Sequence, residues 1–405
     1  MAMLEGKVIE EVKRRLGGAD IPVSLQFWNG QRYAGGADAL VSIRLNGPHA
    51  LARLAKPTLG SLARAYVEQD IDIEGAARHI LQLGDHLCPA DASCRDRKGS
   101  AAWQWWRHTR ARDRKNIQYH YDVSNDFYGL WLDQRRVYSC AYFRTPDLDL
   151  DAAQEAKLDH ICRKLALKPG ETLLDIGCGW GGLILHAAGN YGVRALGITL
   201  SDNQRDYALE QVVRRELQGR VEVRLMDYRE VPEEGCYDKI ASVGMFEHVG
   251  RRNLGEYFAK IRRLLKPGGL VMNHGITSAA LDSRGLAGGI SEFVDDYVFP
   301  GGELVHASEV VRAAASAGLE CLDCENLRPH YGKTLWHWVE RLEARQDEAR
   351  RLIGEQKYRI WRIYMAGSAH AFERGWLELW QVLAGKGVGG VQPQYPYSRD
   401  HVYCA

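Results

Sequence analysis

The chain has 405 residues, of which 45% are hydrophobic and 26% are charged, and its formal net charge at pH 7 is +1. This length is sufficient for two domains, and the near-neutral charge gives no indication of a nucleic-acid partner. The sequence contains no run of eighteen apolar residues, and its charged N-terminal segment lacks the apolar core of a signal peptide. We therefore expect a cytoplasmic protein without a transmembrane helix.

The first segment, residues 1–85, mixes strand and helix patterns. Apolar and polar residues alternate from Val23 to Phe27, and Asn29-Gly30 then predicts a hairpin turn. A second strand pattern follows at 39–45, and a helical pattern follows at 51–66. These patterns predict a small α+β domain, in which we find no cluster of acids, bases or metal ligands.

Residues 86–118 have the composition of a basic linker. Between Arg95 and Lys115 there are eight lysines or arginines and two aspartates, and WQWW occupies 103–106. Tryptophan beside arginine is typical of a membrane interface, where indole is amphipathic and the cations meet anionic head groups. A solvated linker whose tryptophans pack on the next domain has the same composition. Both interpretations stay open at this point.

Strand and helix patterns alternate from about Asp151 onward, and this alternation predicts a parallel sheet with helices on both faces. The tail from Thr334 to Leu383 is predicted as a pair of helices, and 384–405 as irregular. Together these patterns predict a Rossmann-like α/β domain over 119–405. The expected strands are 172–176, 193–198, 221–226, 239–243 and 270–274, and the expected helices are 154–167, 203–217 and 253–265.

A glycine-rich loop, LLDIGCGWGGL at 173–183, follows the first of these strands and opens a helix. Gly177, Gly179 and Gly181 let the backbone turn tightly and approach a ligand, which the helix N-terminus then faces. A dinucleotide-binding enzyme would show a similar loop, so the loop alone does not identify the cofactor.

Acidic residues distinguish the two cofactors. Asp175 comes just before the loop and Asp227 follows a later strand, an arrangement that suits an ammonium group and an adenine amine better than a pyrophosphate. A dinucleotide enzyme would need an acidic residue about twenty positions on, where GITLSDNQ instead offers the uncharged Thr199 and Gln204. The sequence therefore predicts S-adenosylmethionine as the cofactor.

Two further strand ends carry polar residues: SVGMFEHVG at 242–250 and NHGI at 273–276. Strand C-termini in open α/β sheets face the ligand crevice, so Glu247 and His274 are expected to converge there, with Tyr331 closing the site. Taken singly, a glutamate can cap a helix, a histidine is often structural, and Cys140 can be a core residue. Their joint placement at one crevice favours a catalytic role.

Six motifs occur in an order that resembles the cyclopropane-fatty-acyl-phospholipid synthase family, which includes the mycolic acid cyclopropane synthases. They are YHYDVSNDFYGLWLD, YSCAYF, LLDIGCGWGG, GITLSDNQ, FEHVG and NHGI, within residues 116–383. The mycolic acid enzymes lack a long N-terminal domain, whereas PTLGSLARAYVEQDIDIEG at 57–75 resembles the N-terminal domain of the phospholipid-modifying branch.

The resemblance implies roles for individual residues. It implies that bicarbonate is held by Cys140, Glu247, His274, the backbone of Ile276 and Tyr331, with Tyr121 near the reacting carbon. It also implies that S-adenosylmethionine is bound, beside Asp175, by Tyr138, Ser139, Gly177, Gly179, Thr199, Leu200, Gln204 and Gly244, with Asp227 and Tyr228 near the adenine.

The function implied is transfer of a methylene group to the double bond of an unsaturated acyl chain in membrane phospholipid. An activated methyl group adds to the alkene, aromatic faces such as Tyr121 and Phe246 stabilise the carbocation, and bicarbonate removes the proton that closes the ring, with no metal. Such a protein is expected to be peripheral to the inner face of the membrane and to form a homodimer. A methyl-branched or methylene product, a small-amine N-methyltransferase and a catalytically silent lipid-binding protein stay open as alternatives.

Overall fold

The computed structural model describes most of the chain, and its residues form two compact units. We call unit 1 the group formed by Met1–Lys98, Gly285–Pro300 and Trp338–His370, and unit 2 the rest of the chain. The predicted boundary at residue 118 differs from this division, because it left 285–300 and 338–370 with the catalytic domain. The described residues are 10, 13–14, 16–17, 21–34, 38–55, 57–88, 124–232, 236–282, 286, 288–299, 302–389, 391 and 395–403.

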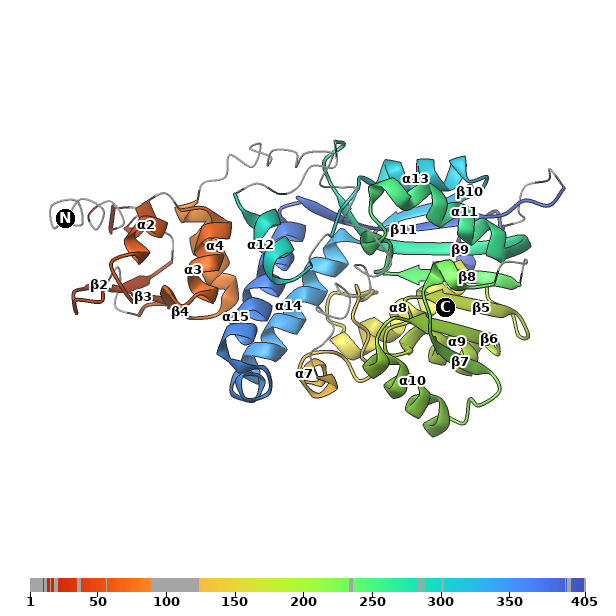
Figure 1. The fold of residues 1–405 in the computed structure, drawn as a ribbon, viewed down its shortest axis with the longest axis horizontal. Coiled ribbons are helices and arrows are strands. Elements are labelled where there is room, and N and C mark those ends of the chain that lie inside the picture. The colour runs from red at the N-terminus through yellow and green to blue at the C-terminus, as the bar shows by residue number, and fades with distance from the viewer. Residues whose placement is uncertain are drawn as a thin grey trace. The chain divides into compact units, whose positions relative to one another are not determined.

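Unit 2 is built on a seven-stranded sheet with the order β10-β11-β9-β8-β5-β6-β7 (Figure 1). Strands β9, β8, β5, β6 and β7 run parallel to one another, and β11 lies antiparallel between β10 and β9. The strand order reverses at β5, which pairs with both β6 and β8, and such a reversal is where open α/β sheets bind ligands. The bounds are β5 Thr172–Ile176, β6 Arg194–Thr199, β7 Val221–Leu225, β8 Tyr237–Val243, β9 Leu265–Ser278, β10 Glu320–Asn326 and β11 Leu377–Gly385.

Helices cover both faces of this sheet, as the alternation of strands and helices predicted. Because successive strand residues point to opposite faces, Leu173 packs into one core and Leu174 into the other. The first core contains residues of α8 (Leu150–Lys164), α9 (Gly182–Tyr191) and α10 (Asp202–Arg214), and the second contains residues of α11 (Leu254–Leu264) and α13 (Ala307–Ser316). Shorter elements are α7 (Asn125–Gly129), α16 (Asp400–Tyr403) and 3₁₀ turns at Tyr228–Glu230, Phe246–His248 and Arg251–Asn253.

All five predicted strands of the parallel sheet are confirmed, but the prediction for the tail is wrong at one point. The segment from Leu377 onward was taken as the end of a helical pair, and it is strand β11. Leu377 and Leu379 are buried and alternate with partly exposed residues, a period-two pattern. Pairing with β9 on one side and β10 on the other supplies the backbone hydrogen bonds. Since β10 was itself not predicted, this pairing could not be expected.

Unit 1 contains a four-stranded sheet with the order β2-β1-β3-β4. The hairpin predicted at Asn29-Gly30 is confirmed: β1 and β2 are antiparallel, and Gly30 has φ 84°, a conformation that favours glycine. The helix predicted at 51–66 forms two helices, because Pro57 interrupts it. The elements are β1 Val23–Gln26, β2 Arg32–Ala34, β3 Val41–Leu45, β4 Ile71–Glu74, α2 Ala50–Ala55, α3 Leu59–Val67, α4 Ala77–Leu87 and α12 Ile290–Tyr297, with parts of α14 Arg328–Ala344 and α15 Gln346–Glu373.

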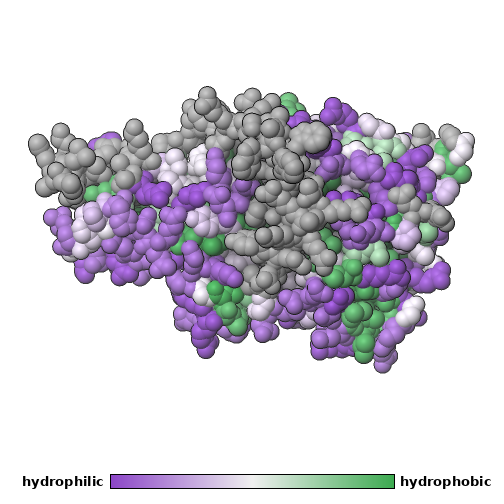
Figure 2. Space-filling view, viewed as in Figure 1, coloured by the Kyte–Doolittle hydropathy of each residue, from purple (hydrophilic) through white to green (hydrophobic). Residues whose placement is uncertain are grey.

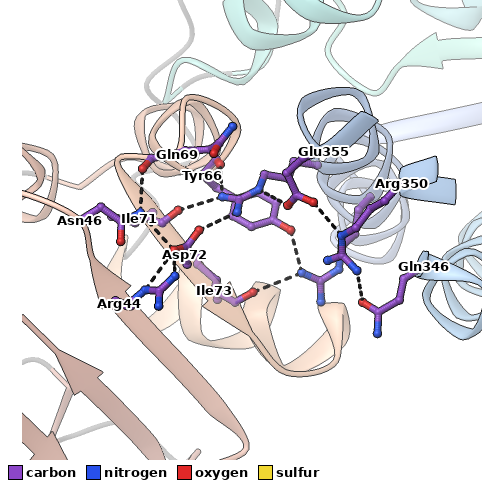
Figure 3. Close-up of polar contacts among 12 residues, drawn as sticks. Arg44, Asn46, Tyr66, Gln69, Ile71, Asp72, Ile73, Gln346, Arg350 and Glu355 are labelled. Atoms are coloured by element: carbon purple, nitrogen blue, oxygen red, sulfur yellow. Dashed lines mark hydrogen bonds and ion pairs between the residues drawn. The ribbon is translucent and has the colours of Figure 1, made fainter. Parts of the chain in front are cut away.

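Two buried arginines of α15 bind the backbone around β4 in unit 1 (Figure 3). Arg359 donates to the carbonyl oxygens of Tyr66 (2.9 Å) and Ile71 (3.3 Å). Arg362 donates to the Gly75 carbonyl oxygen at 2.5 Å and to Glu343 Oε1 at 2.8 Å. Segments far apart in the sequence thus form one unit because these guanidinium groups satisfy carbonyl groups of a distant strand.

Within the described ranges, no helix combines the length and apolarity needed to cross a bilayer. On the face drawn in Figure 2, hydrophobic residues gather over α10, where Leu209 and Val213 are 39% and 61% exposed. Single exposed apolar residues of this kind are ordinary on protein surfaces. The WQWW motif and the rest of the predicted linker beyond Cys88 lie outside the described residues, so the two interpretations of it stay open.

Candidate active site

A cavity lies at the carboxyl ends of the parallel strands of unit 2. All predicted cofactor-binding residues line it, from five different parts of the chain. Its lining also includes Lys157, Trp180, Met245 and His248, which sequence reasoning did not single out. The predicted residues in the lining are Tyr138, Ser139, Asp175, Gly177, Gly179, Thr199, Leu200, Gln204, Asp227, Tyr228 and Gly244.

The glycine-rich loop turns sharply between β5 and α9 and forms the floor of this cavity. Gly177 has φ 83°, and a Cβ atom there would meet the Met245 side chain at 3.0 Å. Gly181, with φ 86°, is the N-cap of α9, so the unpaired N–H groups of the first helical turn follow directly after the loop. A small polar ligand can therefore approach the backbone closely here.

Asp175 is the only aspartate of β5, and its side chain lines the cavity although it is 2% exposed. Its Oδ1 atom has no hydrogen-bond partner among the described residues. Burial raises the pKa of this carboxyl to about 7, an effect that the nearby Lys157 opposes. A buried acceptor without a partner indicates that a ligand donor is expected at this place.

Polar residues after β6 and β7 complete the lining. Thr199 Oγ1 donates to Gln204 Oε1 at 2.8 Å, and Ser201 accepts from the Gln204 backbone at the start of α10. The Asp227 carboxylate accepts from Arg229 at 2.6 and 2.8 Å. A ligand amine at Asp227 would therefore share this carboxylate with Arg229.

The segment before α8 supplies the remaining wall. Lys157 Nζ donates to Ser139 Oγ at 2.9 Å, and Gln154 Nε2 donates to the Ser139 carbonyl oxygen at 2.8 Å. The Tyr138 ring packs against Trp131, with ring centroids 5.4 Å apart. These contacts fix the backbone on both sides of Ser139, directly before Cys140.

Glu247 follows β8 in the 3₁₀ turn Phe246–His248, and His274 lies within β9, opposite Val243, the last residue of β8. The strand predicted to end at 274 continues to Ser278, because β11 pairs with it over its whole carboxyl half. Glu247 Oε1 accepts from the Ile276 backbone N–H at 2.7 Å, while Oε2 has no partner in the described part of the chain. Burial raises the pKa of Glu247 to about 7. The His274 carbonyl oxygen accepts from the N–H of Gly244, which lines the cavity, at 2.8 Å. This backbone hydrogen bond links the cavity to the place of Glu247 and His274.

The His274 imidazole is oriented by Gln381, which lies opposite it on β11. The Gln381 amide nitrogen contacts His274 Nδ1 at 3.1 Å, and His274 Nε2 is without a partner among the described residues. Burial lowers the pKa of His274 well below its usual value, so the ring is neutral. With Nδ1 accepting from Gln381, the ring proton lies on Nε2, which is then a donor.

Cys140 and Tyr331 are brought to the same place by the backbone of Leu327. Leu327 donates to the Leu379 carbonyl oxygen at 2.7 Å, and Leu379 lies opposite Ile276 in the sheet. The Leu327 carbonyl oxygen accepts from the Tyr331 N–H at 3.1 Å and from Cys140 Sγ at 3.9 Å. Burial raises the pKa of the Cys140 thiol, so it stays protonated. Tyr121 lies outside the described residues, and its role stays a prediction.

The Gly275 backbone passes so close to Glu247 that no side chain fits there. A Cβ atom at Gly275 would meet Phe246 ring carbons at 2.2 Å and Glu247 Oε1 at 2.9 Å. We expect Gly275→Ala to displace the carboxylate and lower turnover about 100-fold, because small displacements of reacting groups are costly. Steady-state kinetics with Gly189→Ala as control measures this, since a Cβ atom at Gly189 meets nothing within 4 Å. Wild-type turnover in Gly275→Ala would contradict the tight fit.

Comparisons with known proteins agree with this geometry. A family model described as mycolic acid cyclopropane synthetase matches residues 108–382, and a domain of unknown function matches 16–84. A probable fatty acid methyltransferase of Pseudomonas putida is 44% identical over 383 residues, which are 95% of this chain and 96% of the relative.

The cyclopropane-fatty-acyl-phospholipid synthase of Escherichia coli (strain K12) is 38% identical over 269 residues, 66% of this chain and 67% of that enzyme. A solved structure of a mycolic acid cyclopropane synthase, complexed with SAH and CTAB, has a TM-score of 0.64 and 36% identity. It covers 67% of this chain and 98% of that one. Unit 2 thus has the fold of S-adenosylmethionine-dependent methyltransferases, and the resemblance predicted from the motifs is confirmed. The chain belongs to the mycolic acid cyclopropane synthetase family.

Proposed function

We propose that the protein transfers a methylene group from S-adenosylmethionine to the double bond of unsaturated acyl chains in membrane phospholipid. One observation carries this proposal: two sets of buried polar atoms without partners among the described residues adjoin at one edge of the sheet. The first set is Asp175 Oδ1, whose residue lines the cavity. The second set is Glu247 Oε2 and His274 Nε2, whose residues lie outside the cavity lining. The first set suits a cofactor with an ammonium group, and the second suits a small oxyanion.

The residues of the cavity fit S-adenosylmethionine. When bound, this cofactor supplies an electrophilic methyl group. We assign its ammonium group to Asp175 Oδ1, which lacks a partner in the described structure, and its carboxylate to the loop at Gly177 and the start of α9. Tyr138, Ser139, Thr199 and the residues after β7 would hold the rest. The related synthase solved as a complex with SAH supports this assignment.

The residues of the other half fit bicarbonate. Bound there, bicarbonate would supply the base that accepts the proton lost on ring closure. Glu247 Oε2 offers an acceptor and His274 Nε2 a donor, while the Ile276 N–H holds Glu247 in place. The Leu327 carbonyl oxygen accepts from both Cys140 Sγ and the Tyr331 N–H, and we assign these two residues to the same bicarbonate site. The Phe246 ring, directly beside Gly275, supplies an aromatic face for the carbocation.

A second candidate function is methylation of a fatty acyl chain without ring closure. The Pseudomonas putida relative, similar over almost the whole chain, is named a probable fatty acid methyltransferase. In that case the same addition to an alkene would end in a methyl-branched or methylene-bearing alkene, because the cation loses a different proton. A small-amine N-methyltransferase needs no bicarbonate, so the set of Cys140, Glu247, His274 and Tyr331, which we assign to bicarbonate, favours a lipid acceptor.

The product decides between these candidates. We expect the full-length protein, given S-adenosylmethionine, bicarbonate and vesicles of monounsaturated phosphatidylethanolamine and phosphatidylglycerol, to convert acyl chains to cyclopropane derivatives. Mass spectrometry would show one added CH₂ unit, and proton NMR would show the ring and the loss of the double bond. An added CH₂ unit with the double bond retained would establish the methylene product instead. Unchanged lipid, together with turnover on an amine, would exclude both lipid reactions.

Access to a bilayer is part of the same proposal. We propose that the protein acts as a peripheral protein at the inner membrane surface and as a homodimer. Co-sedimentation with anionic vesicles and light scattering of the free protein measure these two properties. Protein that stays in the supernatant at all lipid concentrations, or a monomeric mass, would contradict the respective part.

A further inference from the structure

Lys157 is a buried lysine on α8 that lines the cavity of the candidate active site. Its side chain is 1% exposed, and its ammonium group donates to Ser139 Oγ at 2.9 Å. Taking an ammonium ion out of water costs several kcal/mol unless charges and hydrogen bonds compensate it, so its retention requires an explanation. The proposed reaction described above does not use it.

Lys157 and Asp175 line the same cavity, and the Asp133 and Asp175 carboxyls and the Cys140 and Cys162 thiols act electrostatically on the ammonium group without a direct ion pair in the described part of the chain. Asp133, before α8, accepts from the backbone N–H groups of Arg135 (2.9 Å) and Val137 (2.7 Å), and Asp175 lies on β5. Lys157 lowers the pKa of both carboxyls, against the effect of their burial. Its own pKa is lowered to about 8 by burial, and the carboxylates oppose this. The titratable groups that face Lys157 or Asp175 are Asp133, Cys140, Cys162, Cys178 and His274.

We propose that Lys157 is a positioning residue of this site, whose ammonium group fixes Ser139 and supplies the counter-charge of the Asp175 carboxylate. The proposal deepens the proposed function and rests on it, since Asp175 is assigned to the cofactor ammonium. Ser139 and Cys140 are adjacent, so the same contact also holds the segment that leads to the other half of the site. Lys157 thereby connects the cofactor loop, α8 and the segment of Cys140.

This role has a pH signature. Only ionised Asp175 binds an ammonium group well, and its pKa of about 7 places the change near neutrality. A nearby cation lowers a carboxyl pKa by about 1–3, so loss of Lys157 raises the pKa of Asp175. The ionised fraction at neutral pH then falls, and it recovers as the pH rises above the new pKa. Loss of a merely structural contact would weaken binding equally at all pH values.

The test is calorimetric titration of the full-length protein with SAH between pH 6.5 and pH 8.5. Lys157→Met keeps the length of the side chain and removes its charge. We expect it to weaken SAH binding about tenfold near pH 7 and only about twofold near pH 8.5, from the shift of a carboxyl pKa by a lost neighbouring charge. Ser139→Ala, which removes the hydrogen bond and keeps the charge, should weaken binding by the same factor at every pH.

If Lys157→Met does not fold, Lys157→Gln takes its place, because the amide keeps a donor for Ser139 and removes the charge, and the same pH-dependent loss is expected. Wild-type SAH affinity should fall as the pH drops through 7, and Asp175→Asn should abolish this dependence. A wild-type to Lys157→Met ratio that is constant with pH would overturn the inference, as would a wild-type affinity independent of pH. Wild-type protein that binds no SAH at any pH would overturn the proposed cofactor and this inference together. A wild-type protein that binds SAH but leaves lipid unchanged would overturn only the proposed acceptor.

Discussion

Glu247→Gln is expected to lower turnover by about 10²–10⁴-fold, the usual effect of removing a group that serves proton transfer. Glutamine keeps an oxygen for the Ile276 N–H, which Glu247 Oε1 accepts at 2.7 Å, so the local backbone is undisturbed. What it removes is the charge on Oε2, the atom without a partner in the described structure. Steady-state kinetics with the vesicle substrate measures the loss.

The affinity for SAH distinguishes a role of Glu247 in proton transfer from a role in cofactor binding. Glu247 is outside the cavity lining, so SAH affinity of Glu247→Gln should stay within about twofold of wild type. Glu256→Gln, at an exposed glutamate that pairs with Arg263, is the control and should change neither quantity. Loss of SAH binding in Glu247→Gln would show that Glu247 serves cofactor binding and not proton transfer. Unchanged turnover would mean that its charge is not used.

Arg362→Met is expected to destabilise unit 1 by about 3–5 kcal/mol, because it removes one partner of a buried ion pair. Arg362 is 8% exposed and donates to Glu343 Oε1, to the Tyr66 hydroxyl oxygen at 3.0 Å and to the Gly75 carbonyl oxygen. Figure 3 labels Tyr66 among these acceptors. Methionine fills the volume of the side-chain stem but leaves these acceptors without their donor. The cost is therefore mainly that of buried polar groups left unpaired.

Hydrogen exchange measured by mass spectrometry reports this change locally. Amides of β4 and α15 should lose protection by on the order of 100-fold, which corresponds to about 3 kcal/mol. The matched control is Arg345→Met, since Arg345 is 52% exposed and, among the described residues, its side chain pairs with Glu348 alone, in an i,i+3 ion pair between α14 and α15. Exposed pairs of this kind contribute about 0–1 kcal/mol. Equal protection in the two variants would show that the buried network is not what holds β4.

Local patterns in the sequence were sufficient for the parallel part of the sheet. The strand at 172–176 was predicted with its bounds, because a short apolar run followed by a glycine-rich turn and a helix is specified locally. The same local specification placed Asp175, Thr199 and Asp227 at strand ends, and these residues line one cavity. That they bind a cofactor stays a prediction.

Other features depended on contacts that no local pattern contains. Lys157 was passed over although it lies on one helix face with Ala153 and Ile161, both fully buried, which was the available signal. Strand β11 was taken for a helix because its period-two pattern follows a long helix directly, and its partners β9 and β10 come from elsewhere in the chain. Tertiary pairing overrides local preference in such cases.

The sequence by itself determined the α/β class, the glycine-rich turn and the family, since each depends on residue types at short spacing. Only the tertiary structure decided which polar atoms remain without partners and which segments share a core. Glu247 Oε1 is satisfied by Ile276 while Oε2 is not, and Arg362 joins 338–370 to the N-terminal unit. Burial and hydrogen-bond satisfaction belong to the packed chain as a whole, because the partners lie far apart in the sequence.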